Sequence, residues 1–550
     1  MMSDGFGFTF DGHAVSARSG QSLAAALTEA GQRALRQTAS GGSRGMFCGM
    51  GVCQDCLVTV DGVPNRRACM TLAEPGQRVQ TQVALAPLSD AVAKAVPARH
   101  IAPDVLVIGG GAGGLNAAIA AAGAGARVVV LDERKVPGGQ YFKQASGNAP
   151  VLDGQQAEGH ALVARAIASG AEIIGGVEIW GAFDGPLILA EHQGGALVAR
   201  PGKVIVATGA YERPRMVPGW TLPGVMTTGA AQTLWRSYRT LPGKRVAVCG
   251  SGPLNLQVAL ELAMGGAEVV LVAETAAAPW QRPVAAMALA LAGPGLAAKG
   301  VQFMLGLRRR GVPVRHTTGL VLVETEGTAL RATFKDGAGR ETSVVVDVLC
   351  MNDGFEPQNE ILRLFGAKMT HDPQFGHLRC DRDDQMQTSV PGIYAVGDCA
   401  GLGGAPAAAV EGRIAGLAAA DAAVPGALHA DLARHRRFQT RLWALHSPGP
   451  RSLATTPHDT IICRCEEITL GQVRAGLSDK PGHAGTLKRA TRLGMGRCQG
   501  RYCGAVAARL VAEAAGQPVN DHSHFAPRVP VKPVSIAAIL AAQEALDGPA

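Results

Sequence analysis

Two glycine-rich segments, each between a strand and a helix, constrain the fold of this chain more than any other feature. The first reads DVLVIGGGAGGLNAAIAAAGAGARVVVLDE over residues 104–133, and the second reads RVAVCGSGPLNLQVALELAMGGAEVVLVAE over residues 245–274. A buried strand, a glycine turn, a helix and a second strand form the βαβ unit of a parallel sheet, in which the turn and the helix N-terminus bind a pyrophosphate. The sequence therefore predicts an α/β fold with two dinucleotide-binding domains.

The first segment carries a complete dinucleotide motif. Its turn supplies four glycines: Gly109, Gly111, Gly113 and Gly114. An acid that binds the ribose is expected about 20 residues further on, and Asp132 and Glu133 both stand at the end of the second strand. Strand register favours Asp132, and Glu133 stays the alternative.

Three later segments identify FAD as the ligand of this first site. A second glycine turn at 138–140 lies just past the acid, where it can approach the flavin. The segments VIVATG (204–209) and IYAVGD (393–398) read as strands that end in small residues, and a helix follows the second of them. The candidate FAD contacts in these segments are Gly139, Gln140, Ala207, Thr208, Gly209, Gly397 and Asp398.

The second glycine turn departs from the motif. Gly250 and Gly252 are present, but Asn255 takes the third glycine position, which governs how closely the helix packs on the strand. Glu274 ends the next strand and can bind a ribose 2′-hydroxyl, which argues against NADP. We expect an NAD-type domain, and the sequence leaves open whether NAD, ATP or no nucleotide occupies it.

Residues 104–425 resemble the glutathione reductase and thioredoxin reductase superfamily, in which two Rossmann-like domains bind FAD and a nicotinamide nucleotide. The resemblance implies an FAD-binding domain over 104–241 and 353–425, with the NAD-type domain inserted at 242–352. The alternation of strands and helices along this region agrees with such parallel sheets.

The first of two cysteine sets lies near the N-terminus, with the spacing Cys48-x4-Cys53-x2-Cys56-x12-Cys69. Its first three members match plant-type [2Fe–2S] ferredoxins, and nearby glycines can turn backbone N–H groups toward the sulfurs. The whole set resembles the ferredoxin domain of succinate dehydrogenase iron–sulfur subunits, which implies a β-grasp domain over 1–83. An Ala- and Pro-containing linker over 84–103 follows, and zinc is the alternative occupant of the cysteine site.

The second set, Cys463-x-Cys465 and Cys498-x4-Cys503, lies near the C-terminus. With its flanks CRCEEIT and GMGRCQGRYCG it resembles the bacterioferritin-associated ferredoxin domain, which implies a small helical [2Fe–2S] domain over 456–516. Arg464, Arg497 and Arg501 would offset the thiolate charge. A helical connector over 426–455 precedes this domain, a tail over 517–550 is expected to lie on the surface, and zinc is again the alternative.

Composition narrows the function classes. Twelve cysteines in a chain of 550 residues without a secretory segment indicate metal or redox chemistry rather than disulfides. The remaining four (Cys249, Cys350, Cys380 and Cys399) are isolated and are expected to be buried apolar residues. The net charge of +8 is scattered, its densest run being the solvated turn 308–310, so nucleic acid is not an expected partner. No apolar run is long enough to span a membrane, and a cytoplasmic location is expected.

The order of domains resembles the α-type subunits of heteromeric amine-oxidising flavoenzymes, a group that includes sarcosine oxidase, hydrogen cyanide synthase, opine oxidase and the proline or D-hydroxyproline dehydrogenases. The resemblance implies an oxidoreductase acting on CH–NH or CH–NH2 donors, with a D-amino-acid-oxidase-like β subunit that carries its own FAD. It also implies FMN between the subunits in some members. The chain would relay electrons from the oxidation of an amino acid or secondary amine (sarcosine, opine, proline or hydroxyproline, or glycine) to an external acceptor.

The residues themselves agree with a relay, because they offer carrier sites and no evident constellation of catalytic acid, base or nucleophile. Two other interpretations stay open: a stand-alone NADH-dependent acceptor reductase, and a subunit that holds its nucleotides statically. The sequence does not determine the amine, the final acceptor, the order of electron transfer or the stoichiometry of the complex.

Overall fold

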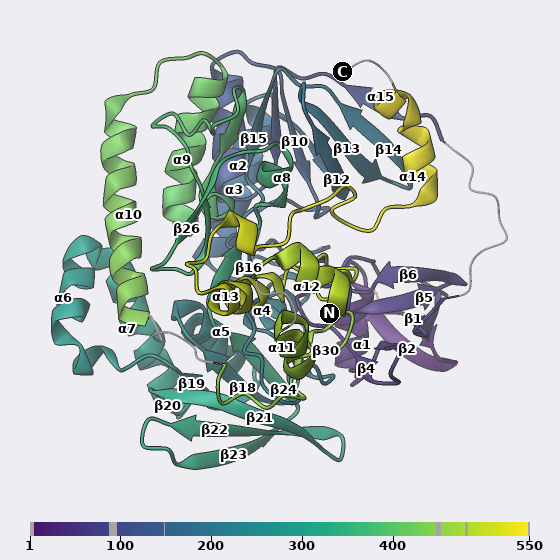
Figure 1. The fold of residues 1–550 in the computed structure, drawn as a ribbon, viewed down its shortest axis with the longest axis vertical. Coiled ribbons are helices and arrows are strands. Elements are labelled where there is room, and N and C mark those ends of the chain that lie inside the picture. Colours follow the sequence, from purple (N-terminus) through teal and green to yellow (C-terminus); the bar gives the residue numbers. More distant parts are fainter. Residues whose placement is uncertain (1–4, 87–95, 148, 447–452, 479–481, 548–550) are drawn as a thin grey trace.

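The computed structural model describes residues 5–86, 96–147, 149–446, 453–478 and 482–547. Two nucleotide-domain sheets form the upper and lower parts of the molecule in Figure 1, and the N-terminal domain lies at the right. The short helices between residues 470 and 515 lie near the centre of this view, where the other parts meet.

The N-terminal domain is a five-stranded sheet in the order β2-β1-β7-β5-β6. Its strands are β1 (Gly5–Phe10), β2 (His13–Arg18), β5 (Leu57–Val60), β6 (Val63–Arg67) and β7 (Arg78–Thr81). The helix α1 (Leu23–Glu29) begins where the Ser22 hydroxyl accepts a hydrogen bond from the Ala25 N–H group. A short hairpin, β3 (Arg36–Gln37) and β4 (Ser43–Arg44), precedes the cysteine loop that contains the first three cysteines.

The first nucleotide domain is built on a parallel sheet in the order β11-β10-β9-β15-β28. These strands are β9 (Val105–Ile108), β10 (Val128–Asp132), β11 (Glu172–Gly175), β15 (Lys203–Val206) and β28 (Ile393–Ala395). β9 and β10 are buried at every position because both faces of the sheet are covered, which is why they read as continuous apolar runs. One face packs on α2 (Ala112–Gly123) and α9 (Gly404–Ala419). The helix α3 (Gly154–Ala168) packs against α2.

A second sheet, in the order β12-β13-β14-β8, covers the other face. Its strands are β12 (Val177–Phe183), β13 (Leu187–His192), β14 (Gly195–Ala199) and β8 (Arg99–Ile101). The strand β8 lies within the segment expected to be a linker, and it pairs in parallel with β14.

The second nucleotide domain repeats the arrangement of the first, with a parallel sheet in the order β17-β24-β18-β19-β20. Its strands are β17 (Val225–Thr227), β18 (Arg245–Gly250), β19 (Glu268–Glu274), β20 (Val314–Arg315) and β24 (Val348–Asn352). Its helices are α4 (Thr228–Tyr238), α5 (Pro253–Met264), α6 (Pro283–Ala292) and α7 (Pro294–Arg309). An antiparallel sheet of β21 (Thr318–Glu326), β22 (Ala329–Asp336) and β23 (Glu341–Val346) lies beside it at the bottom of Figure 1.

Three short pieces complete the central part of the chain before the long helix α10. Strands β16 (Ala210–Glu212) and β25 (Phe355–Pro357) pair with each other, as do β26 (Met369–Asp372) and β27 (His377–Cys380). The helix α8 (Glu360–Leu364) follows β25, and α10 (Gly426–His446) follows α9.

The C-terminal cysteine region is small and mainly helical. It comprises β29 (Ile461–Cys463), β30 (Ile468–Thr469), α11 (Leu470–Ser478), α12 (Ala484–Thr491) and α13 (Gly504–Ala515). Its apolar residues share one buried cluster with the second nucleotide domain and with the first cysteine loop. Cys48 and Cys53 of the first set therefore share a core with the second set, although they lie more than 400 residues from it in sequence.

The tail does not simply lie on the surface, as expected from its Pro-rich sequence. Its helices α14 (Ile536–Ala541) and α15 (Gln543–Asp547) carry Ala542 and Ala545 into a buried cluster with Trp180 and Leu189 of the β12-β13-β14-β8 sheet. The Val531 N–H group donates to the Trp180 carbonyl oxygen. Small apolar side chains at intervals in the tail provide this packing.

The structure confirms the predicted α/β fold with two parallel nucleotide-binding sheets, an N-terminal mixed sheet and a helical C-terminal region. It also confirms that Cys249, Cys350, Cys380 and Cys399 are buried and unpaired by disulfides. None of the helices in the described parts of the chain combines the length and the apolar character that crossing a membrane requires.

Candidate functional site

A cavity of about 850 Å³ runs between the two nucleotide domains and reaches both glycine turns. It brings together most of the predicted nucleotide-site residues: Gly109, Gly111, Gly113, Asp132, Glu133, Gly139, Gln140, Ala207, Thr208, Gly209, Gly252, Gly397 and Asp398. Gly114, Gly250 and Glu274 do not line the cavity. The segments that were predicted from three distant parts of the sequence therefore converge on one site.

The first glycine turn is packed so closely that side chains would not fit. A Cβ atom on Gly114 would lie 1.8 Å from the Gly109 carbonyl oxygen, so α2 can approach β9 only without one. Gly139 has a φ of +65°, and a Cβ atom there would lie 2.8 Å from the Gly111 Cα atom. The two glycine turns thus form one continuous backbone surface on the cavity wall, which suits a pyrophosphate.

Asp132 and Glu133 have different roles in the structure. The Asp132 carboxylate accepts hydrogen bonds from the N–H groups of Gly110, at 2.5 Å, and Arg134, at 2.7 Å. In the second domain the Glu274 carboxylate accepts a hydrogen bond from the Gly252 N–H group at 3.0 Å. Asp132 and Glu274 lie at corresponding ends of their strands. Glu274 pairs with Gly250, and Leu131, which precedes Asp132, pairs with Ile108. Asp132 thus occupies the position beside the glycine turn that a ribose-binding acid requires.

Glu133 instead joins three parts of the chain at the cavity wall. It pairs with Arg67 of the N-terminal domain, at 3.0 Å, and with Lys532 of the tail, at 2.5 Å. Burial opposes ionisation, but these two cations outweigh it and hold the pKa of Glu133 at about 2. The carboxylate is therefore ionised over the whole physiological range and fastens both ends of the chain to the first nucleotide domain.

Two buried charged residues of the cavity, Lys143 and Glu212, were not predicted as site residues from the sequence. The Lys143 ammonium donates to the Gln140 carbonyl oxygen and to the Gln232 side-chain oxygen, each at 2.9 Å, and burial lowers its pKa to about 7. Glu212 accepts from the Gly229 N–H group at 2.8 Å, and burial raises its pKa. Both residues line the cavity near the predicted flavin side, and only the position of Lys143 three residues after Gln140 hinted at it.

The second glycine turn is in contact with the end of α10. The Ser251 hydroxyl donates to the His446 carbonyl oxygen at 2.5 Å, and the His446 Nδ1 atom lies 3.5 Å from the Glu274 carboxylate. Asn255 is buried, where it accepts from the Thr228 hydroxyl and donates to the Asn352 carbonyl oxygen. Its amide thus takes part in packing α5 on the sheet, and the residues predicted to bind a second nucleotide are engaged by the chain itself.

The first cysteine set is buried, and its thiols contact one another in pairs. Cys48 contacts Cys53, and Cys56 contacts Cys69. Burial raises the pKa of Cys48, but hydrogen bonds from the Cys53 thiol and from backbone N–H groups outweigh it and bring the pKa to about 6. The Met50 N–H group, at 3.5 Å, is one of these donors, so the glycine-rich loop does turn its amides toward a sulfur.

The second cysteine set shows the same pairing. Cys463 contacts Cys503, and Cys465 contacts Cys498. The predicted cation Arg501 lies beside Cys498, donates to its carbonyl oxygen at 2.9 Å and pairs with Glu360 at 3.1 Å. Among the described residues, no three or more Cys, His, Asp or Glu side chains converge as a single metal ion would need. The contacts thus pair the thiols two by two, and two thiols per iron is the ligation of a [2Fe–2S] cluster held by four cysteines.

A buried ion pair connects the two cysteine loops directly. Asp55, between Cys53 and Cys56, accepts from the Arg464 Nε atom at 2.6 Å and from an Arg36 guanidinium nitrogen at 2.7 Å. Arg464 itself lies between Cys463 and Cys465. The side chains of Asp55 and Arg464 are 0% and 3% exposed. Because opposite charges keep Asp55 ionised against the effect of burial, its pKa stays below the usual value.

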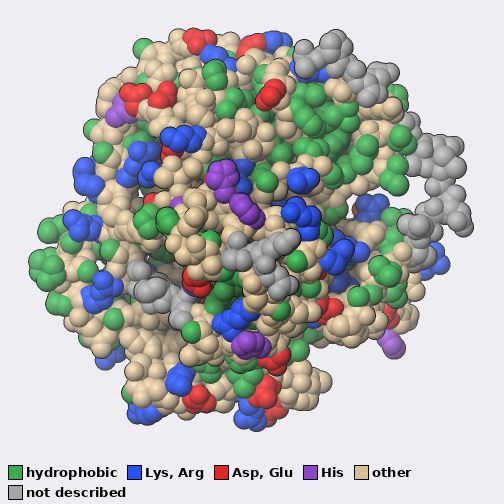
Figure 2. Space-filling view, in the orientation of Figure 1, with side chains coloured by type: hydrophobic (Ala, Val, Ile, Leu, Met, Phe, Trp, Pro, Cys, Tyr) green, Lys and Arg blue, Asp and Glu red, His purple; other side chains and the backbone are tan. Residues whose placement is uncertain are grey.

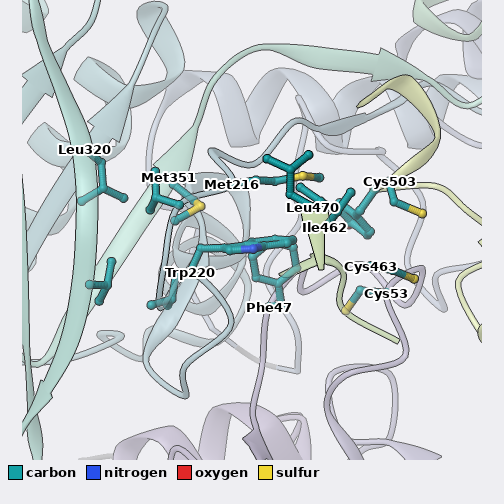
Figure 3. Close-up of a cluster of buried hydrophobic side chains, with 14 of the residues drawn as sticks. Phe47, Cys53, Met216, Trp220, Leu320, Met351, Ile462, Cys463, Leu470 and Cys503 are labelled. Carbon is teal, nitrogen blue, oxygen red and sulfur yellow. The ribbon is translucent and has the colours of Figure 1, made fainter. Parts of the chain in front are cut away.

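Aromatic side chains surround this ion pair. The Arg464 guanidinium lies over the Phe47 ring, 3.9 Å from its centroid, and near the Trp220 ring, at 4.7 Å. The rings of Phe47 and Tyr502 meet edge to face, with centroids 5.3 Å apart. Each of these two residues precedes a cysteine of its own set, so the loops also touch through their aromatic neighbours. Figure 3 shows the rings of Phe47 and Trp220 beside each other, with Cys53 and Cys463 nearby.

Removing the Asp55 charge tests this connection. In an Asp55→Asn variant, Arg36 and Arg464 would be buried without an anionic partner, which should cost about 3–5 kcal/mol of stability. We expect hydrogen exchange of segments 36–56 and 461–470 to accelerate together. Glu74→Gln removes the same charge from an exposed site of the same domain and should change neither segment. Exchange that is unchanged in Asp55→Asn would contradict the role of the ion pair.

The low pKa of Lys143 predicts a pH effect. Above pH 7 the folded protein holds Lys143 neutral, whereas the unfolded chain keeps it protonated up to about pH 10, so stability rises with pH in this window. Relative to Lys143→Met, the wild-type protein should gain up to about 1 kcal/mol per pH unit between pH 7 and 9.5. Melting temperatures of both proteins across this range measure the effect. A difference that stays constant with pH would show that Lys143 titrates normally.

Comparison with known proteins agrees with this geometry. Residues 103–420 match the pyridine nucleotide-disulphide oxidoreductase family, residues 4–84 match the 2Fe-2S iron-sulfur cluster binding domain, and residues 460–543 match the sarcosine oxidase A3 domain. The solved structure of L-proline dehydrogenase from P. horikoshii is similar over 97% of both chains, with a TM-score of 0.73 and 21% identity, so it shares the fold.

An opine oxidase subunit from Agrobacterium tumefaciens is 33% identical over 458 residues, which are 79% of this chain and 90% of that protein. Two subunits of the hydrogen cyanide synthase of Pseudomonas aeruginosa each match this chain. Its subunit HcnB is 28% identical over 79% of this chain and 97% of its own length, and its subunit HcnA is 46% identical over 72 residues, 13% of this chain and 69% of its own length. The chain thus belongs to the pyridine nucleotide-disulphide oxidoreductase family, as a relative of this opine oxidase subunit that also carries a 2Fe-2S domain.

Proposed function

We propose that this chain is the electron-relay subunit of a heteromeric enzyme that oxidises an amino acid or a secondary amine. It would hold FAD and two [2Fe–2S] clusters and pass electrons from a partner flavoprotein to an external acceptor. The observation that carries this proposal is the contact between the two cysteine loops through Asp55 and Arg464, next to the cavity of the first glycine turn.

The FAD would be held by the residues that converge on the cavity. The backbone at 109–114 and 138–140 accommodates the pyrophosphate, Asp132 accepts from ribose hydroxyls, and Asp398 lies at the start of α9, where it accepts from the N–H groups of Gly403 and Gly404. Lys143 would place a positive or neutral group beside the cofactor, depending on pH. A bound flavin can accept two electrons and release them singly, which is the conversion that a relay to one-electron clusters requires.

The clusters would be held by the eight cysteines, two thiolates to each iron. The ligands of the first are Cys48, Cys53, Cys56 and Cys69, and those of the second are Cys463, Cys465, Cys498 and Cys503. The backbone N–H groups near Cys48 and the Arg501 side chain near Cys498 stabilise thiolate charge. The aromatic and aliphatic residues between the loops exclude water from the space between the two sites.

A partner subunit would supply the amine-oxidising site. The related proteins are named as subunits of opine oxidase, hydrogen cyanide synthase and sarcosine oxidase. We assign the partner as a D-amino-acid-oxidase-like flavoprotein with its own FAD, with FMN at the interface as a further carrier. The match of residues 4–84 to the 2Fe-2S domain supports a domain boundary near residue 84, and two separate subunits of the hydrogen cyanide synthase match this chain. The remaining domains would be the FAD-binding segments (104–241 and 353–425), the inserted domain (242–352) and the C-terminal cluster domain (456–516).

A stand-alone NADH-dependent acceptor reductase is the second candidate. The shared cavity favours it, because Gly252 and Gly209 line the same space. The contacts of His446 with Ser251 and Glu274 oppose it, since they engage the groups that a dinucleotide would use. The occupant of the second domain would accordingly be a static NAD or ATP, or no nucleotide.

The relay predicts how the holoprotein is reduced. The complex with the product of the neighbouring gene is mixed anaerobically with sarcosine, glycine, an opine, proline or hydroxyproline. One of these should bleach the flavin of this chain and produce the EPR signals of reduced [2Fe–2S] clusters, whereas NADH should do neither. Rapid bleaching of the flavin in the isolated chain by NADH would favour the acceptor reductase. Clusters that stay oxidised both with substrate and with dithionite would favour a subunit that holds its nucleotides statically.

Cysteine variants provide the matched control. Cys465→Ser removes a ligand of the second site and should halve the iron content while the first cluster signal remains. Cys350→Ser changes a buried cysteine of β24 that belongs to neither set, and it should keep all the iron. Equal iron content in the two variants would contradict the second cluster and leave the first intact.

A further inference from the structure

A row of large apolar side chains is exposed on the helix pair α6–α7, away from the cysteine sets. We call it the α6–α7 ridge, and it consists of Val284, Met287, Leu291, Val301 and Leu305 of these helices together with Trp280 of the turn before α6. Val284 and Leu291 are 82% and 80% exposed, and Trp280 is 68% exposed. Apolar side chains gather at the left edge of Figure 2, at the place of α6 in Figure 1. Exposed apolar groups at this density mark an interaction surface.

The α6 part of the ridge is the outer face of a helix whose other face is already packed. Val284, Met287 and Leu291 follow one another at spacings of three and four residues, so they share one side of α6. Leu289 points away from that side and lies in a buried cluster with Phe438 and Leu445 of α10. Folding of the chain therefore accounts for the inner face of α6 and leaves Val284, Met287 and Leu291 exposed on its outer face.

The sequence segment that carries the ridge has charges of one sign. Residues 275–323 contain no Asp or Glu, and they contain six cations: Arg282, Lys299, Arg308, Arg309, Arg310 and Arg315. The helix α10, which packs on α6, adds the exposed cations Arg437 and Arg441. The basic run 308–310, which the sequence suggested to be a solvated turn, ends α7 and belongs to this surface. A binding surface that combines apolar side chains with cations and lacks acids complements an anionic partner.

We propose that the α6–α7 ridge docks on the surface of a membrane that contains anionic lipids. Short helices with an apolar face and flanking Lys and Arg bind in the plane of the lipid interface, with Trp at headgroup depth. Juxtaposed cations gain further attraction from the negative surface potential. The described helices are not of the kind that crosses a membrane, so the contact is peripheral.

Docking at the ridge also orients the cavity. Trp280, Val301 and Leu305 belong to the ridge and line the cavity as well. Bound in this way, the molecule turns the α6–α7 side of the cavity toward the lipid. This inference concerns the location of the enzyme and does not depend on which carriers the chain holds.

Vesicle flotation tests the proposal with the full-length holoprotein. Vesicles consist of phosphatidylcholine alone or of phosphatidylcholine and phosphatidylglycerol in equal parts. The wild-type protein should float with the anionic vesicles and not with the neutral ones, and raised salt should weaken binding. The triple variant Val284→Ser, Met287→Ser, Leu291→Ser should bind at least about tenfold more weakly.

The control variant carries three equivalent substitutions at exposed apolar residues of the N-terminal region: Val63→Ser, Val83→Ser and Leu85→Ser. It should bind vesicles like the wild-type protein, and flavin absorbance checks that both variants are folded. Absence of binding to anionic vesicles, or equal binding by the ridge variant, would overturn the proposal. Binding by the chain alone that is lost in the complex with its partner subunit would also overturn it, because the ridge would then be a subunit interface.

Discussion

Asp55 is a carboxylate without exposed surface that lies between two guanidinium groups, those of Arg36 and Arg464. Such a group is stable in the interior only while its partners stay in place, because an unpaired buried charge costs several kcal/mol. Since Asp55 and Arg464 each stand between two cysteines of a set, the ion pair holds the two cysteine loops in contact. The position of the C-terminal region in the centre of the molecule follows from this contact and from the shared apolar core around Phe47 and Trp220.

A second set of ion pairs attaches the same two regions to the first nucleotide domain. Glu133 binds Arg67, two residues before Cys69, and Lys532, one residue after Val531, whose carbonyl oxygen accepts from Arg501. Glu133, which directly follows β10, is thus connected to both cysteine sets through short chains of contacts. The chain as a whole places its candidate carriers next to one another although their ligands come from both ends of the sequence, which is the organisation that a relay requires.

The features that were predictable from the sequence are those that depend on local spacing. The glycine turns, the register of Asp132 and the cysteine sets are each determined within a single short stretch of sequence, and all of them could be read without the fold. Asp55 and Arg464 are separated by 409 positions, and Lys532 and Glu133 by 399, so their pairing could not be predicted. The contacts of Lys143 and His446 could not be predicted either. Lys143 donates to Gln232 of α4, and the contact of His446 with Ser251 depends on the path of α10. The packing of the tail was not predictable either, because single alanines give no periodic signal.

We propose that the two cysteine sets hold [2Fe–2S] clusters close enough to exchange electrons directly. EPR of the fully reduced holoprotein measures this, because two paramagnetic clusters at short distance broaden and relax each other. The wild-type protein should give magnetically coupled signals, and the Cys465→Ser variant should give the signal of one isolated cluster. Two independent, uncoupled signals from the wild-type protein would contradict it, since the clusters would then lie apart despite the Asp55–Arg464 contact.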